Sequence, residues 1–231
     1  MCIRDSLQDV LDHRPANLSA PIQMCDGLSR NEPRSETLKA NCNSHGRREF
    51  VEIADRFPAE CEQVLETIKL VYKNEIDTVK QKMTPDQRLL HHQTNSAQPM
   101  ETMRVWMEQK LSGTQIEPNG DLGGAFKYVL KRWSKLTLFL RQAGVPLDNN
   151  LCERILKTSI RHRDNSLFYK TMIGAKVGDF FMSIIQTCRL CGKDPFDYLS
   201  TLRRHVGKLP ENPSAWMPWN YQATAAGPPA T

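Results

Sequence analysis

Two short apolar runs near the start of the chain predict β-strands, at residues 21–25 and 38–42. The first run ends at Asp26-Gly27, a turn signal, so we expect Asp26 at the carboxyl tip of its strand. Residues 1–18 show neither a helical nor a strand period. We therefore expect a ragged start, meaning that this segment is non-native or disordered as a result of a truncation or an assembly artefact.

From residue 45 onward, apolar side chains recur at the three- and four-residue spacing of amphipathic helices. A first helical pattern spans residues 45–57, and a long one follows it. Thr84-Pro85-Asp86 combines an N-cap, a proline at the first helical position and an acid in the first turn, and so predicts another helix start. We expect residues 58–113 to be helical and to be packed by their own apolar stripes rather than by the sheet.

The second half of the chain shows four more helical patterns, at about 122–142, 150–161, 175–191 and 195–206. The proline-rich tail from residue 210 predicts irregular or disordered structure, with Trp216 and Trp219 packing it onto the body. The chain is thus mainly helical with two short strands. Strands this short need further strands to pair with, and the predicted elements of this chain include few.

Composition narrows the class of protein. The chain has 231 residues, of which 39% are hydrophobic and 25% charged, as in a globular protein. No run of about 18 apolar residues occurs, which excludes a helical membrane span. No apolar stretch follows the first basic residue, so we expect no secretory signal. Seven scattered cysteines argue against a disulfide scaffold and for a reducing cytoplasm.

Positive charge is concentrated in one segment. The net charge of the chain is +5, yet residues 127–176 alone carry eleven Lys and Arg against three acids. This concentration is expected of a protein that binds a phosphate backbone, and a solvated basic face explains it equally well. Arg154, Lys157 and Arg161 share one face of a predicted helix, which favours an outward basic stripe.

Two smaller polar clusters have competing interpretations. Arg47 and Arg48 could be a solvated pair at an expected helix start. Cations there oppose the helix dipole, however, which favours another partner, and a DNA phosphate is the natural one. His91-His92 has no acid or thiol at ligand spacing, and we expect both on the surface.

Four residues could form a zinc site. Cys42-x-x-His45 and Cys188-x-x-Cys191 together would give a Cys3His set, which structural zinc accepts. The second pair lies within an apolar helical stripe, which is typical of buried free cysteines, so the zinc interpretation is the weaker one.

The segment PLDNNLCER, residues 146–154, has two interpretations. Asn150 is a good N-cap and Glu153 falls three residues later, the spacing of a capping box, which is the interpretation that spacing alone favours. Alternatively, Glu153 is a carboxylate amid basic residues that coordinates a hard cation such as Mg²⁺.

The same segment resembles the signature of the insertion sequence 66 family of bacterial transposases, which are DDE-type enzymes. Further motifs agree in order: MCDGLSRN at 24–31, NCNSHGRR at 41–48, NSLFYKT at 165–171, PFDYL at 195–199 and WMPWNY at 216–221. The resemblance covers roughly residues 17–222.

The resemblance implies an α/β fold, mainly helical as given: a truncated RNase H-like core with a helical insertion. Its implied parts are a partial core at 19–57, the insertion at 58–113, the C-terminal part of the core at 114–209 and a tail at 210–231. Asp26 then corresponds to the second carboxylate of the DDE triad and Glu153 to the third. Cys42, His45, Asn149 and Asn150 become auxiliary site residues.

The resemblance also implies the chemistry. Two Mg²⁺ or Mn²⁺ ions about 3.5–4 Å apart, held by three carboxylates, activate the attacking oxygen in DNA cleavage and strand transfer. The first Asp of the triad is expected upstream, and Asp5, Asp9 and Asp12 lack its context. We therefore expect the chain alone to be catalytically silent.

The expected partners and location follow from the family. The partner is DNA, bound through Arg47, Arg48, Arg154, Lys157 and Arg161, and the complete protein is expected to be a homo-oligomer in the bacterial cytoplasm, at the nucleoid. The alternative function is a non-catalytic DNA-binding or dimerising fragment that interferes with intact transposase.

Overall fold

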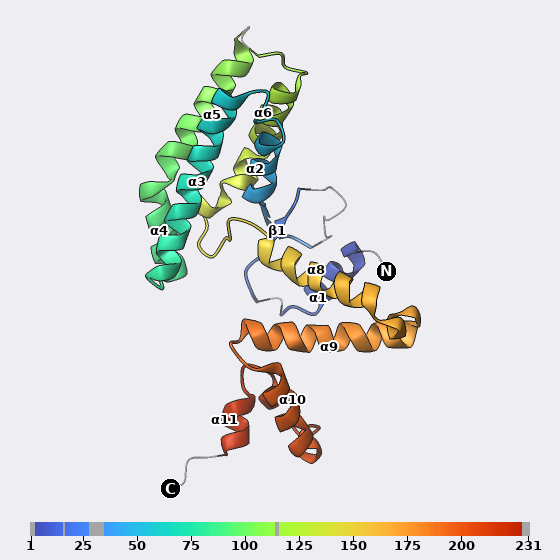
Figure 1. Cartoon of the computed structure of the whole chain (residues 1–231). Helices are drawn as coiled ribbons and strands as arrows, with labels where there is room; N and C mark the ends of the chain where they lie inside the picture. The colour runs from blue at the N-terminus through green and yellow to red at the C-terminus, as the bar shows by residue number, and fades with distance from the viewer. Residues whose placement is uncertain (1–2, 16, 28–34, 114–115, 228–231) are drawn as a thin grey trace. The chain divides into compact units, whose positions relative to one another are not determined.

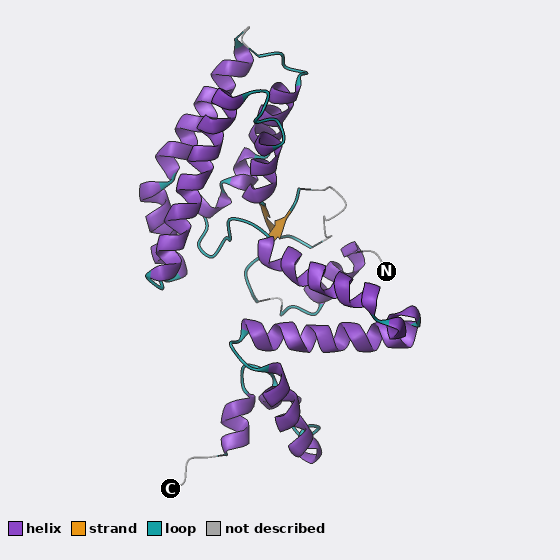
Figure 2. Ribbon diagram, in the orientation of Figure 1, coloured by secondary structure: helices purple, strands orange, loops and turns teal. Residues whose placement is uncertain are grey.

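The computed structural model describes residues 3–15, 17–27, 35–113 and 116–227. The chain divides into two compact units, Met1–Leu151 and Cys152–Thr231 (Figure 1). Each unit has its own cluster of buried apolar side chains. Both are built mainly of helices, and the described strands belong to the first unit (Figure 2). No helix in the described ranges combines the length and apolar character needed to cross a membrane.

The two predicted strands are confirmed. β1 (Ile22–Cys25) and β2 (Leu38–Asn41) pair in parallel, with Cys25 opposite Asn41. Parallel strands end at the same edge of a sheet, so Asp26 and Cys42 both leave that edge. A backbone hydrogen bond of 3.0 Å from Cys42 N to Cys25 O continues the pairing by one residue.

α2 (Asn43–Val51) begins directly after β2 and is shorter than the predicted helix over 45–57. The chain continues in turns, yet Ile53 and Phe57 still contact the core. The helical spacing of these residues therefore reflects packing from a turn rather than a continuous helix.

The helices predicted within 58–113 are confirmed. The N-cap Thr84 and Gln87 form a reciprocal capping box, and the third helix ends at Gly113. The helices are α3 (Pro58–Lys80), α4 (Pro85–Asn95) and α5 (Ala97–Ser112).

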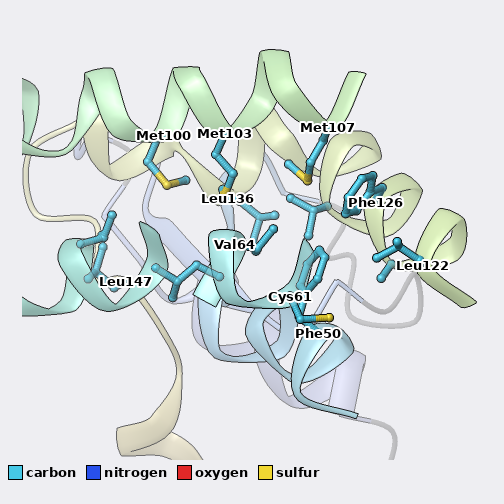
Figure 3. Close-up of a cluster of buried hydrophobic side chains, with 14 of the residues drawn as sticks. Phe50, Cys61, Val64, Met100, Met103, Met107, Leu122, Phe126, Leu136 and Leu147 are labelled. Atoms are coloured by element: carbon cyan, nitrogen blue, oxygen red, sulfur yellow. The ribbon is translucent and has the colours of Figure 1, made fainter. Parts of the chain in front are cut away.

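These helices do not pack by their own stripes alone, so that part of the prediction is wrong. Met103 and Met107 of α5 and Val64 of α3 lie in one cluster with Phe50 of α2 and Phe126 of the helix that follows α5 (Figure 3). The rings of Phe50 and Phe126 lie 5.9 Å apart, centroid to centroid. The predicted insertion therefore shares one core with the elements on either side of it in the sequence.

The single helix predicted at 122–142 is broken into three pieces, so its continuity was wrongly predicted. The Thr137 hydroxyl donates to the Trp133 carbonyl at 2.7 Å, and the Arg141 guanidinium donates to Thr137 and to the Ser134 carbonyl. Side chains that bond nearby backbone groups in this way favour tight turns over a continuing helix. The pieces are α6 (Asp121–Lys131), α7 (Trp133–Leu136) and the 3-10 helix η2 (Leu138–Leu140).

The ragged start predicted for residues 1–18 is wrong for Ile3–Asp12, which form the helix α1. Leu7 and Leu11, one turn apart, are half-buried and line a hollow together with Ile22 of β1. Their four-residue spacing is the signal for a helix within this short segment.

The second unit continues from α8 (Asn150–Asn165), whose first two residues belong to the first unit. Its core contains Cys188, Tyr198, Trp216 and Tyr221, and the Tyr198 hydroxyl donates to the Trp216 carbonyl at 2.9 Å. The remaining elements are η3 (Leu167–Lys170), α9 (Met172–Leu190), α10 (Pro195–Arg204), η4 (Val206–Lys208), η5 (Pro213–Trp216) and α11 (Tyr221–Ala226).

The irregular tail predicted from residue 210 is therefore wrong for residues 213–226. Trp216 is buried, as expected of a residue that packs the tail, whereas Trp219 is 58% exposed. Pro213, one of the prolines that suggested disorder, is the first residue of η5.

Candidate functional site

The carboxyl edge of the strand pair carries Asp26, as the sequence predicted. Gly27 follows with a φ of +83°, in the left-handed region that favours glycine. A Cβ at Gly27 would lie 3.0 Å from the Nε of Arg132, so the Arg132 side chain lies against the strand end. The Arg132 guanidinium carbon lies 3.8 Å from the ring centroid of Tyr128, a cation–π contact that fixes its direction.

Asp26 is close enough to this pair to act on it electrostatically. Burial raises the pKa of Tyr128, the Arg132 charge opposes this, and the carboxylates of Glu49 and Asp26 add to the rise. In the sequence, Arg132 is only one member of a basic segment. Nothing in its spacing indicates a place beside Asp26, because the contact joins elements more than a hundred residues apart.

A polar network surrounds Asp148 in the segment that resembles the family signature. Oδ2 of Asp148 accepts hydrogen bonds from the Tyr72 hydroxyl at 2.7 Å, the Asn150 amide at 2.8 Å and the Ser44 hydroxyl at 3.3 Å. Oδ1 accepts the Asn150 backbone N–H at 3.0 Å. The Asn150 amide also donates to Ser44 at 3.0 Å.

This network occupies most of Asp148, because an ionised carboxylate has about four acceptor positions. Asp148 therefore holds the first residue of α8 in place. Burial, together with the hydrogen bond to Asp148, raises the pKa of Tyr72 well above its usual range, so Tyr72 remains a donor. Tyr72 and Ser44 were not predicted as site residues, since both lie far from Asp148 in the sequence.

The network corrects the capping-box interpretation of Asn150 and Glu153. Asn150 is the first helical residue, and the carboxylate that accepts its N–H belongs to Asp148. Glu153 is then the fourth residue of α8 and is half-buried. Asp26 belongs to the first unit and Glu153 to the second, so their predicted proximity stays a prediction.

Cys42, His45 and Asn149 were predicted as auxiliary residues. Cys42 is 1% exposed, and burial raises the pKa of its thiol, the state of a structural cysteine. Backbone N–H groups of Asn149, His45 and Ser44 partly offset this rise. Cys42 therefore lies between the end of β2 and the segment that carries Asp148. The side chains of His45 and Asn149 are half-buried.

Asn43 fastens the same segment to α2. Its side-chain amide donates to the carbonyls of Leu136 and Leu147, both at 3.1 Å, and its backbone N–H donates to Leu147 at 3.0 Å. The start of α2 and the 146–150 segment thus form one hydrogen-bonded body at the strand ends.

Arg47 and Arg48 are both exposed on α2. The helix begins at Asn43, so Arg48 lies in its last turn, where the helix dipole favours a cation. The predicted conflict with the dipole is therefore wrong, and it no longer argues for a DNA phosphate. Their exposure still leaves both guanidinium groups accessible to an anion.

The basic residues Arg154, Lys157 and Arg161 are exposed on α8. Across the described ranges, no carboxylate lies within 4.0 Å of any of them. Leu156 and Ile160, on another face of α8, are 60% and 48% exposed. The basic stripe is thus confirmed as outward, whereas α8 buries no face.

His92 was predicted on the surface, and this is wrong. The ring is fully buried between helices, with Nε2 2.8 Å from Glu75 Oε2 and Nδ1 2.9 Å from Ser96 Oγ. Arg88 donates to the same Glu75 oxygen at 2.8 Å and to the Val145 carbonyl at 2.7 Å. The acid that pairs with His92 comes from α3, beyond the reach of local spacing.

In the described part of the chain, no three His, Cys, Asp or Glu side chains lie close enough together to hold a metal ion. The four residues of the zinc interpretation divide between the two units. The donors that the family resemblance assigns are the half-buried carboxylates of Asp26 and Glu153. Their hard oxygen atoms are the ligand type that Mg²⁺ and Mn²⁺ prefer, so the donor set fits those ions.

Comparison with known proteins gives a consistent result. A family model described as Transposase IS66 family matches residues 9–177, which include Asp26 and Glu153. The chain is similar to two uncharacterized proteins of Sinorhizobium fredii (strain NBRC 101917 / NGR234). It is 30% identical to y4qI over 198 residues, which cover 84% of this chain and 36% of y4qI. It is 27% identical to y4jD over 203 residues, which cover 86% of this chain and 39% of y4jD.

The chain thus spans less than two fifths of the length of these curated relatives. No solved structure matches it.

Proposed function

Because the chain belongs to the IS66 family of transposases, we propose that it binds DNA and supplies two carboxylates, Asp26 and Glu153, to the catalytic site of a DDE-type transposase. The activity is proposed for the whole protein, of which this chain corresponds to a part in its longer relatives. The proposed core is RNase H-like, with residues 58–113 inserted between its carboxylates.

The observation that carries this proposal is the place of Asp26. It follows β1 directly, at the edge where two parallel strands end, beside the residue that follows β2. In open α/β sheets, ligands bind at the carboxyl ends of the strands. A carboxylate there is suited to hold a divalent cation.

A bound pair of Mg²⁺ or Mn²⁺ ions would supply the activation of the attacking oxygen and the stabilisation of the leaving oxygen. The chain's own residues provide the frame. Asp148 fixes the first residue of α8 through its hydrogen bond to Asn150 N, and Glu153 lies in the first turn of that helix. Arg132 places a positive charge against Gly27, the residue that follows Asp26.

DNA affinity in this proposal is mainly electrostatic. Arg47, Arg48, Arg154, Lys157 and Arg161 are all exposed and able to contact phosphates. The whole protein acts as a homo-oligomer on paired DNA ends in the bacterial cytoplasm.

The test measures Mn²⁺ binding to the chain by electron paramagnetic resonance, with the element's terminal DNA present. Asp26→Asn and Glu153→Gln are each expected to weaken binding at least tenfold. If both residues hold the same ions, the double variant loses no more Mn²⁺ affinity than either single variant. Glu62→Gln removes an exposed carboxylate of α3 and serves as the control.

Cleavage of the same DNA is measured in parallel, and the chain alone is expected to show none. Cleavage that Glu153→Gln abolishes while DNA affinity is kept would overturn this silence and support the catalytic role. DNA binding without any effect of either carboxylate on Mn²⁺ would favour the alternative, a non-catalytic DNA-binding protein.

A further inference from the structure

A hollow of about 710 Å³ lies between α2 and α3. Three cationic side chains line it, Arg47 from α2 and Lys69 and Lys73 from α3. Lys69 and Lys73 are four residues apart, so they project from the same face of the helix. All three are exposed.

The charges of this hollow are only partly neutralised. Lys69 donates to both carboxylate oxygens of Glu66, at 2.9 and 3.0 Å, in a pair that is 73% and 59% exposed. An exposed pair of this kind contributes little and exchanges readily for another anion. Arg47 and Lys73 have no carboxylate within 4.0 Å anywhere in the described ranges.

Besides the three cations, the lining contains Glu66, Ser44 and an apolar part. Leu65, Ile68 and Ile76 of α3 line it, and Ile76 is 52% exposed. The Tyr72 ring is also part of the lining. A site with cations beside apolar and aromatic side chains matches a polyanion whose bases are available for contact.

The hollow reaches the segment that carries the family signature. Its lining residues Ser44 and Tyr72 are the same residues that hydrogen-bond Asp148, which fixes the start of α8. A ligand in the hollow would therefore lie next to the hydrogen-bonded body at the strand ends.

We infer that the hollow between α2 and α3 binds a single DNA strand, with phosphates on Arg47, Lys69 and Lys73 and bases against the apolar wall and Tyr72. A duplex would bring its phosphates but keep its bases paired, leaving the apolar wall uncovered. The inference rests on the proposed function and deepens it, since it names the surface that receives an unpaired strand.

The experiment measures the affinity of the full chain for a fluorescein-labelled oligothymidylate by fluorescence anisotropy, over a series of salt concentrations. Lys69→Glu/Lys73→Glu is expected to weaken binding at least tenfold. The slope of log affinity against log salt is expected to fall by roughly 1.4, because each single-strand phosphate that a side chain neutralises contributes about 0.7. Lys69→Gln/Lys73→Gln repeats the test without charge reversal and is expected to lower the slope equally.

The matched control is Lys127→Glu/Lys131→Glu. These lysines are also exposed, are also four residues apart on a helix of the first unit, and do not line the hollow. The control variant is expected to bind the oligothymidylate within about threefold of the wild-type affinity. That small loss is the general effect of changing the net charge by four on binding to a polyanion. Circular dichroism melting checks that each variant remains folded.

The outcomes separate this inference from the proposed function. Equal losses in both pairs, or no loss in the hollow pair, overturn the inference while DNA binding stands. If Lys69→Glu/Lys73→Glu loses affinity for duplex DNA only, the assignment of the hollow to a single strand is overturned. A wild-type chain that binds no DNA overturns both.

Discussion

The hydroxyl of Tyr72 in α3 donates a 2.7 Å hydrogen bond to Oδ2 of Asp148, 76 residues further along the chain. The helices between the two predicted carboxylates are thereby tied to the start of α8. α3 is therefore hydrogen-bonded directly to the segment that precedes Glu153.

Removing this hydroxyl tests the tie. Tyr72→Phe keeps the ring and deletes one donor to a charged acceptor, so we expect a loss of about 1.5–3 kcal/mol in the free energy of unfolding. Urea denaturation measures it. A double-mutant cycle with Asp148→Asn is expected to show coupling, because the two residues contact each other directly.

Tyr128→Phe is the control, since no described residue hydrogen-bonds its hydroxyl. Additive effects of Tyr72→Phe and Asp148→Asn would show that the hydrogen bond does not contribute to stability.

The half-buried Glu75 predicts a pH dependence. Burial raises the pKa of Glu75, but the hydrogen bonds from His92 and Arg88 outweigh it, and the net pKa is lowered. A carboxyl group whose pKa is lower in the folded state stabilises the fold above its unfolded pKa of about 4.3. That contribution is lost as the pH falls through the folded pKa.

We therefore expect wild-type stability to fall from about pH 5 downward, and the curve of Glu75→Gln to be flatter there. At neutral pH the variant is expected to be less stable by about 1.5–3 kcal/mol, since hydrogen bonds to a charged acceptor are weakened. Thermal melting over a pH series measures both. Glu66→Gln, an exposed carboxylate on the same helix, should leave the curve unchanged.

Two adjacent glycines of α6 give opposite predictions. A Cβ at Gly123 would collide with the Glu117 carbonyl and lie 2.7 Å from the Pro118 carbonyl oxygen, whereas a Cβ at Gly124 meets nothing within 4 Å. We expect Gly123→Ala to destabilise by about 1–3 kcal/mol, as overpacking against backbone does. Gly124→Ala is expected to stabilise by about 0.5–1 kcal/mol through helix propensity. If chemical denaturation shows that both variants are stabilised, or that both are destabilised, this explanation is wrong.

The basic stripe of α8 is tested with duplex DNA. Lys157→Glu/Arg161→Glu is expected to lower affinity and to reduce the salt slope by roughly 1.8, about 0.9 for each phosphate that the two side chains no longer neutralise. Arg203→Glu/Arg204→Glu changes the charge equally on exposed positions of α10 and should have a smaller effect. Unchanged affinity and slope in the α8 variant would remove this face from the DNA-binding surface.

Local signals in the sequence predicted local structure well. The strand that ends at Asp26 and the helix that begins after Thr84 depend on turn and capping residues within a few positions, and both are confirmed. The helix predicted through Thr137 is broken into α6, α7 and η2, and the Thr137 hydroxyl there bonds the Trp133 carbonyl, a local contact that periodicity does not report.

The candidate site was predictable only in part, for a related reason. Asp26 was proposed from its turn and its motif, and Asn149 and Asn150 from their motif, whereas Asp148 was given no role. Tyr72 and Arg132 enter the site through contacts between distant segments. A single sequence does not report which distant segments contact each other. It therefore contains no signal for the roles of Tyr72 and Arg132, nor for the burial of His92.

The methionine face of α5 has an evolutionary consequence. Met100, Met103 and Met107 are buried against the core, and their unbranched, flexible side chains refill a changed space at low cost (Figure 3). Apolar positions of α3 and α6 that face them can therefore drift between lineages, each step absorbed by a new rotamer. The segment 146–150 has no such tolerance, because its contacts are hydrogen bonds of fixed length and direction. Divergence among relatives is expected to accumulate in the helical core and to spare the carboxylate that starts α8.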